Sequence, residues 1–86
     1  MFEAYKDGGI LTFPNPAKDQ LFIQSDRLEI NKVEIFTSSG VNIESVKFNG
    51  NHKKEIVIDL YDYDQGVYFL HVYSDGETYI EKIIVE

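Results

Sequence analysis

Three aspartates at short spacing are the side chains in this chain that most suggest chemistry. Asp59, Asp62 and Asp64 stand just before the pair Gln65-Gly66. Carboxylates clustered in a turn can bind Ca²⁺ through their oxygens. An EF-hand loop also needs a glutamate that binds with both oxygens at its last ligand position, and no such glutamate stands at that offset here. We therefore interpret this segment as a solvated loop.

The two histidines lack the neighbours that a metal ion would need. His71 alternates with Val67 and Phe69 on an expected strand, and His52 stands beside Lys53 in an expected turn. A zinc site draws on several ligands at characteristic spacing, and no third ligand is spaced near either histidine. The chain has no cysteine, which excludes a thiolate metal site and a disulfide framework. We predict no metal and no cofactor.

Catalysis is not indicated by the remaining polar residues. The serines fall mainly in expected turns, without the strand-to-helix context of a nucleophile elbow. Carboxylates are numerous enough for a pair to support glycoside hydrolysis. Small β-sandwiches rarely present the deep cleft that such chemistry needs, however. We therefore predict that the chain is not an enzyme.

Two tyrosines are the best candidates for a ligand-binding site. Tyr61 and Tyr63 lie in a polar segment, where their rings are expected to be exposed. Exposed rings can stack on sugars, whereas rings on strands mostly pack against their cross-strand neighbours. A carbohydrate-binding or adhesive module that uses these two tyrosines therefore stays open as an alternative. A plain spacer domain is a further alternative.

The elements that position these residues are expected to be strands. Apolar and polar residues alternate with a period of two between closely spaced turn residues, and helical spacing is nearly absent. The strand over 67–73 is apolar on both faces, which is typical of a strand inside a sheet. The predicted strands are 10–13, 20–24, 32–37, 41–48, 55–60, 67–73 and 78–85.

The turn residues predict how these strands are joined. Asn49-Gly50 and Asp75-Gly76 predict tight hairpins, because both central positions of a type I′ turn require positive φ. Pro14 and Pro16 lack backbone donors, so they end the first strand as an edge strand that enters a stiff bend.

Two packed sheets are the arrangement that buries seven short alternating strands. We predict an all-β, immunoglobulin-like antiparallel β-sandwich of about seven strands, without the cysteines and tryptophan of antibody domains. Residues 10–86 form this domain, and residues 1–9 are interpreted as a linker remnant. Because the first and last strands are expected to be edges, we predict a monomer or a weak edge-strand dimer.

The charge of the chain excludes one class of partner. Fifteen acidic and eight basic residues give a net charge of −7, which repels phosphate backbones, so we predict no nucleic-acid partner. No apolar stretch approaches the roughly 20 residues of a membrane-spanning helix. The first residues lack the basic and apolar regions of a signal peptide, so an exported protein would carry its signal peptide on a missing N-terminal part.

Two motifs bracket the sequence. Pro14-Asn15-Pro16 leads into the strand at 20–24, and Gly66-Val67-Tyr68 opens a strand that is followed by the Gly76 turn and by Lys82-Ile83-Ile84-Val85-Glu86. Three shorter motifs stand between them: Val33-Glu34-Ile35-Phe36, Ser39-Gly40 and Ile58-Asp59-Leu60. With these motifs in this order and spacing, the sequence from residue 10 to residue 86 resembles the type A C-terminal sorting domain of the type IX secretion system.

The resemblance implies an export signal. Such domains follow a cargo domain, here missing from the chain, and are recognised by the type IX translocon during passage from the periplasm across the bacterial outer membrane. A surface sortase then removes the domain, with the cut at or before residues 1–9, and leaves the cargo at the cell surface or outside the cell. The hypothesised translocon contacts are Pro14, Asn15, Pro16, Gly66, Val67, Tyr68, Gly76 and Lys82.

Overall fold

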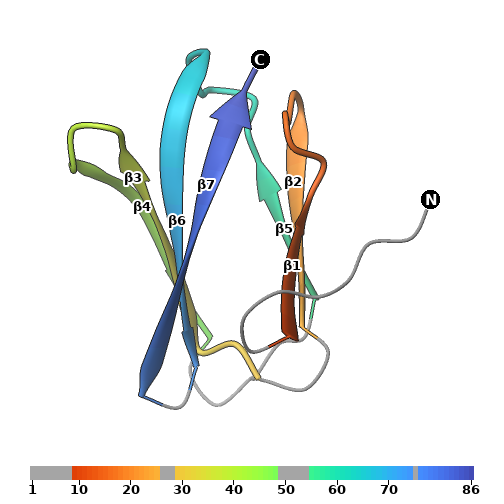
Figure 1. Ribbon diagram of the computed structural model, residues 1–86, viewed down its shortest axis with the longest axis vertical. Helices are drawn as coiled ribbons and strands as arrows, with labels where there is room; N and C mark the ends of the chain where they lie inside the picture. The colour runs from red at the N-terminus through yellow and green to blue at the C-terminus, as the bar shows by residue number, and fades with distance from the viewer. Residues whose placement is uncertain (1–8, 26–28, 49–54, 75) are drawn as a thin grey trace.

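The computed structural model describes residues 9–25, 29–48, 55–74 and 76–86 (Figure 1). Apart from turns and short connections, these residues form strands that run alternately up and down in two layers. The strands are β1 (Ile10–Phe13), β2 (Gln20–Ser25), β3 (Lys32–Thr37), β4 (Asn42–Lys47), β5 (Glu55–Asp59), β6 (Gly66–Ser74) and β7 (Glu77–Val85).

The strands form one sheet of three and one sheet of four. The strand order is β1-β2-β5 in the first sheet and β4-β3-β6-β7 in the second, and every neighbouring pair is antiparallel. The two sheets face each other across a shared interior (Figure 1). The prediction of an all-β antiparallel sandwich is confirmed. The expected interior place of β6 and the edge places of β1 and β7 are also observed.

The core consists of the inward side chains of both sheets. Along β2, β3, β5 and β6, buried residues alternate with exposed or half-buried ones, as the period of two predicts. A fully buried aliphatic side chain contributes about 1.5–3 kcal/mol, so this alternation is the main source of stability. The buried aliphatic residues on the paired strands include Leu21, Ile23, Val33, Ile35, Ile56, Ile58, Leu70, Val72, Ile83 and Val85.

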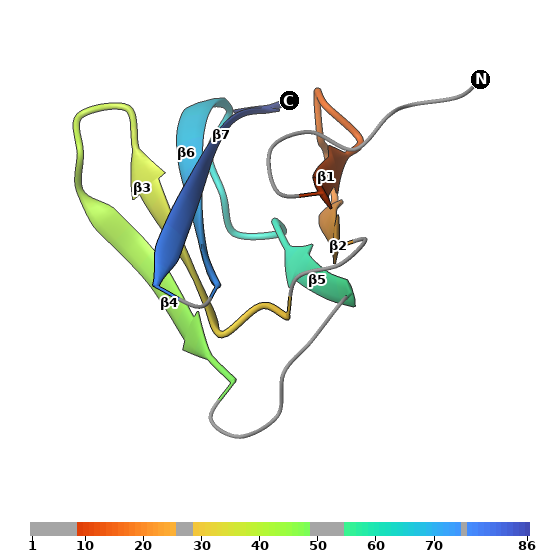
Figure 2. The ribbon, with the colours of Figure 1, turned by 60° about the horizontal axis from the view of Figure 1, so that its bottom comes forward.

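One predicted hairpin is wrong and another is confirmed. The strands on either side of Asn49-Gly50 lie in different sheets, β4 beside β3 and β5 beside β2 (Figure 2), and the turn itself lies outside the described residues. The apolar face of β5 is buried only when that strand joins β2, and this gain outweighs the local turn preference. At the second turn, Ser74 pairs with Glu77 and Gly76 has φ 83°, although Asp75 lies outside the described residues.

Within the described part of the chain, no helix has the length and apolarity needed to cross a membrane.

Candidate functional site

The side chain of Asn15 connects the two motifs that bracket the sequence. Its Nδ2 donates a hydrogen bond to the carbonyl of Lys82 at 3.1 Å, and its Oδ1 accepts one from the backbone N–H of Ile84, also at 3.1 Å. The amide group thus pairs with β7 as a strand backbone would. The flanking prolines carry no N–H of their own, so the carboxamide provides the polar contacts between this segment and β7. Both X–Pro peptide bonds of the motif are cis.

The backbone of Ala17 extends this connection to the end of β7. Its N–H donates to the carbonyl of Ile84 at 2.7 Å, and its carbonyl accepts from the N–H of Glu86 at 2.8 Å, which forms a parallel bridge with Val85. The Ala17 side chain is fully buried. We call the contacts of Asn15 and Ala17 with β7 the clasp. The clasp ties the β1–β2 connection of one sheet to the edge strand of the other.

The start of β6 lies on the other side of the same part of β7. Gly66 pairs with Val85, and Val67 pairs with Ile84. Gly66 has φ 150°, a conformation that side-chain-bearing residues rarely adopt, so glycine is needed where the chain enters this strand. Three of the predicted recognition elements therefore gather at one end of the sandwich, although they are far apart in the sequence.

Tyr68 is a buried residue that connects the core to the loop before β6. Its side chain is 8% exposed, and its hydroxyl donates to the carbonyl of Asp64 at 2.7 Å. The ring of Tyr63 lies edge-on against it, with the ring centroids 5.3 Å apart. The loop between β5 and β6 is thus anchored to the core by a strand residue, which the sequence motif alone did not reveal.

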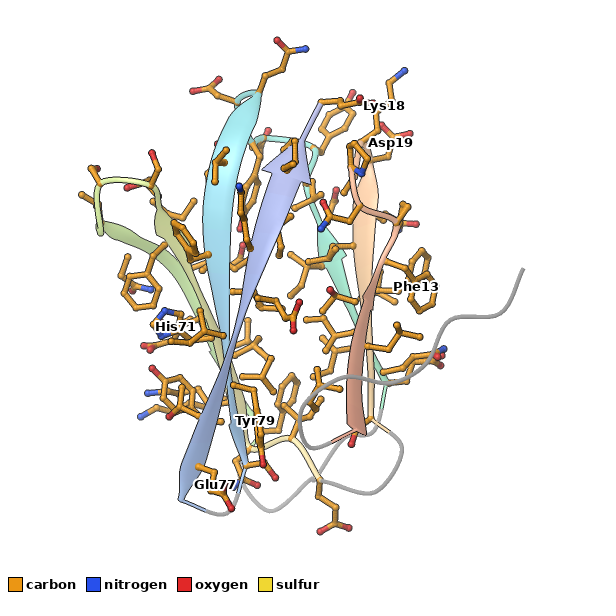
Figure 3. All side chains as sticks on the ribbon, in the orientation of Figure 1. Phe13, Lys18, Asp19, His71, Glu77 and Tyr79 are labelled. Carbon is orange, nitrogen blue, oxygen red and sulfur yellow. The ribbon has the colours of Figure 1, made fainter. Side chains whose placement is uncertain are left out.

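The remaining predicted contacts differ in position. Pro14, Asn15 and Pro16 are exposed, as is Lys82, whose carbonyl belongs to the clasp. Gly76 follows the other end of β6; Figure 3 shows its neighbour Glu77 at the opposite end of the molecule from Lys18 and Asp19. Because eight residue steps along β7 span about 26 Å, Gly76 does not belong to the surface around the clasp.

The two tyrosines of the alternative hypothesis differ in environment. Tyr61 is 84% exposed, whereas Tyr63 is half-buried and donates its hydroxyl to the carboxylate of Glu44. Burial, and then the hydrogen bond to Glu44, raise the pKa of Tyr63 well above its usual range. Both rings line a hollow of about 540 Å³ together with Asp59, Asp62 and Asp64. Among the described residues, no three His, Asp or Glu side chains are grouped to hold a metal ion.

The raised pKa of Tyr63 gives a testable prediction. Because the neutral phenol is favoured in the folded chain, its contribution to stability is complete below pH of about 10 and is lost as the pH rises through the higher folded-state pKa. When the pH of the folded protein is raised to about 11, we expect the gain in tyrosinate absorbance to be the same for Tyr63→Phe as for the wild type. In urea, the same substitution should lower that absorbance by the share of one of the six tyrosines. A loss of absorbance in the folded protein would contradict this prediction.

Sequence reasoning found the motif around Asn15 but not its contacts. The feature of the sequence that could indicate these contacts is the carboxamide of Asn15 between two prolines, which have no N–H groups. Such a carboxamide can pair with the unpaired backbone of an edge strand. The partner on β7 follows Asn15 by 67 positions at Lys82, so no local pattern identifies it.

Two comparisons with known proteins bear on this site. Residues 11–86 match a family model described as a secretion system C-terminal sorting domain. The match spans the clasp, the start of β6 and the whole of β7. No curated protein matches the chain.

Proposed function

Because this chain belongs to the family of secretion system C-terminal sorting domains, and so is a sorting signal for type IX secretion, we propose that the translocon recognises the folded surface around the clasp. The observation that carries this proposal is the pair of hydrogen bonds in which Asn15 donates to the Lys82 carbonyl and accepts from the Ile84 N–H. They join the two motifs into one surface that exists only in the folded domain.

The residues of this surface divide into two roles. In our proposal, the exposed Pro14, Asn15, Pro16, Gly66 and Lys82 contact the translocon. Val67 and the buried Tyr68 support the surface through their pairing with β7 and their anchoring of the loop before β6. In the same proposal, Gly76 supplies the positive φ of its turn and does not contact the translocon.

The later stages of export complete the proposal. A surface sortase removes the domain at or before residues 1–9, which are a linker remnant, while residues 10–86 are the sorting domain itself. The cargo lies on the N-terminal side of that cut, passes through the periplasm and ends at the cell surface or outside the cell. The domain is a non-catalytic tail, and it works by recognition.

The carbohydrate-binding alternative is not favoured. The family assigns the chain to export, and the ring of Tyr63 is already packed against Tyr68 with its hydroxyl bonded to Glu44. Of these two tyrosines, Tyr61 alone presents most of its ring to solvent, so they do not form a paired platform for a sugar.

An export assay tests the proposal directly. Residues 1–86 are fused behind a periplasmic reporter in a host with a type IX system, and the reporter is measured at the cell surface and in the medium, together with loss of the domain. Export with loss of the domain supports the proposal. A folded, uncleaved fusion that stays in the periplasm overturns it.

Lys82→Ala separates recognition from folding. The side chain is exposed, so we expect the free energy of unfolding to change by no more than about 0.5 kcal/mol. We expect export of the reporter to fall by about tenfold, which corresponds to roughly 1.4 kcal/mol of lost binding. The matched control is Thr78→Ala, an exposed position on the same face of β7 but at its other end, which should export normally. Equal export of the two variants would show that the Lys82 side chain does not contact the translocon.

A further inference from the structure

The outer face of the four-stranded sheet carries aromatic rings at its centre. Phe36 and Phe69 are cross-strand partners on β3 and β6, and His71 and Tyr73 follow on β6. The rings of Phe36 and His71 have centroids 4.4 Å apart, and those of His71 and Tyr73 lie 6.4 Å apart. Figure 3 shows His71 on the side of the sheet that faces away from β1, β2 and β5. The outer face of a sandwich normally carries polar residues at such positions.

A hollow is formed between these rings and β7. We call it the outer groove: a space of about 440 Å³ lined by Phe36, Phe69, His71 and Ile80, with Thr37, Ser38 and Gly40 at one end. Ile80 is 58% exposed although it is a large aliphatic residue. The space is large enough for a bulky apolar side chain of a partner, and such a side chain would bury Ile80.

The lysines on the face that carries the outer groove are opposite in sign to the net charge of the chain. Of the four basic residues in the described part of the chain, all but Lys18 lie on this face. Lys32 and Lys47 are cross-strand partners, and Lys82 lies opposite Phe69. The chain as a whole has a net charge of −7, so the lysines on this face reverse the sign of the charge locally.

Among the described residues of β3, β4, β6 and β7, the carboxylate on this face belongs to Glu34, and it is already engaged. The carboxylate of Glu34 accepts hydrogen bonds from the Tyr73 hydroxyl at 2.6 Å and the Ser45 hydroxyl at 3.1 Å, and lies 3.5 Å from the Lys32 ammonium. These contacts lower the pKa of Glu34, chiefly through the bond from Tyr73. Of the described lysines on this face, the exposed Lys47 and Lys82 therefore remain the most open to an incoming anion.

The other outer face provides the contrast. On the three-stranded sheet, Phe13 and Phe22 stack with their centroids 5.4 Å apart, beside Val57, which is 49% exposed. Its charged neighbours on β5 are Glu55 and Asp59, and no lysine or arginine of the described residues lies there. Apolar side chains are thus exposed on both faces, but among the described residues only the outer face of the four-stranded sheet also carries lysines.

We propose that the outer groove docks a polypeptide segment that presents one large apolar side chain flanked by carboxylates. An apolar anchor in a pocket surrounded by complementary charge is the usual arrangement at the centre of a protein interface. This docking goes beyond recognition at the clasp, because the outer groove shares only Lys82 with that surface and the proposal specifies the chemistry of the partner.

Two other occupants fit the outer groove less well. A sugar needs a flat ring platform, and here the rings of Phe36 and His71 are inclined by 43° and those of His71 and Tyr73 by 48°. A second copy of the chain would place lysines against lysines in a two-fold interface. It would also bring two chains of −7 together, −14 in all.

Titration of the isotope-labelled chain with a defined peptide tests the proposal. The probe is a blocked peptide with phenylalanine between two pairs of glutamates, and the readout is the set of backbone amide resonances that shift. We expect the shifts to centre on Phe36, Phe69, His71 and Ile80. A peptide with lysines in place of the glutamates should not bind, and raised ionic strength should weaken the binding of the glutamate peptide severalfold.

Paired substitutions on the two faces give the control. Ile80→Glu should weaken binding of the peptide by about tenfold, because it puts a carboxylate into the outer groove. Val57→Glu should leave binding unchanged, because Val57 is a similarly exposed aliphatic residue on β5, an edge strand of the three-stranded sheet. Since both side chains are exposed, both variants should unfold at the wild-type temperature to within a few degrees.

Four results would overturn the proposal. They are absence of binding at millimolar peptide, equal loss in the two variants, the same shifts with alginate in place of the peptide, and the same shifts on raising the protein concentration alone. Alginate binding would indicate an anionic polysaccharide, and concentration dependence would indicate a second copy of the chain.

Discussion

Removal of residues 82–86 is expected to unfold the sandwich and not only to delete a docking site. Ile83 and Val85 are 2% and 3% exposed, and loss of both forfeits about 3–6 kcal/mol of hydrophobic stabilisation. The deletion also removes the strand pairing with the first residues of β6 and all partners of the clasp. A domain of this length has a total stability of about 4–13 kcal/mol. Urea unfolding followed by circular dichroism should show little or no cooperative transition.

A substitution on the outer side of the same strand is the control. Ile84 is 39% exposed and points away from the core, so Ile84→Ser should keep a cooperative transition near that of the wild type. A truncated chain that unfolds cooperatively at the wild-type urea concentration would contradict the prediction. The result matters for export assays, because a deletion that unfolds the domain cannot distinguish loss of recognition from loss of the fold, whereas Lys82→Ala can.

Tyr68→Ala is expected to have the second large effect. The side chain is buried between the sheets and anchors the loop before β6 through its hydroxyl. Loss of a buried aromatic ring typically costs about 3–5 kcal/mol. Tyr68→Phe keeps the ring and loses only the hydrogen bond to the Asp64 carbonyl, which should cost about 1 kcal/mol. The free energies of unfolding in urea measure both effects.

Tyr61→Ala is the matched control for the removal of a tyrosine. Its side chain is 84% exposed, so its loss should change stability by no more than about 0.5 kcal/mol. If Tyr68→Ala were as stable as the wild type but failed to export, Tyr68 would act in direct recognition and its proposed supporting role would be wrong. A loss of stability in Tyr68→Phe as large as in Tyr68→Ala would assign the anchoring to the hydroxyl alone.

The individual strands were predictable because their information is local. In β5, alternate residues Ile56 and Ile58 are buried while Glu55, Val57 and Asp59 are exposed, which is the pattern visible in the sequence. Partner choice was not local. The pair Asn49-Gly50 predicted that β4 and β5 would be neighbours, but β5 lies beside β2, because only that pairing places its isoleucines against the core.

In the candidate site, too, the residues are indicated by local sequence patterns whereas their contacts are not. Its residues are a prediction from sequence motifs, and the family match confirms the family to which the chain belongs. Their contacts were not visible, because Asn15 and Lys82 are 67 positions apart. The exposure of Tyr68 was equally undetermined. Both faces of β6 are apolar, and alternation alone does not say which face is turned inward.

An all-β chain, the positions of its strands and its family can be inferred from the sequence, since these depend on alternation, turn residues and the order of motifs along the chain. The folded structure was needed to show which strands pair, that the clasp joins the first motif to the last strand, and that Lys32, Lys47 and Lys82 share the outer face with the groove. Pairing and burial depend on how two apolar surfaces fit together, and no segment carries that property alone.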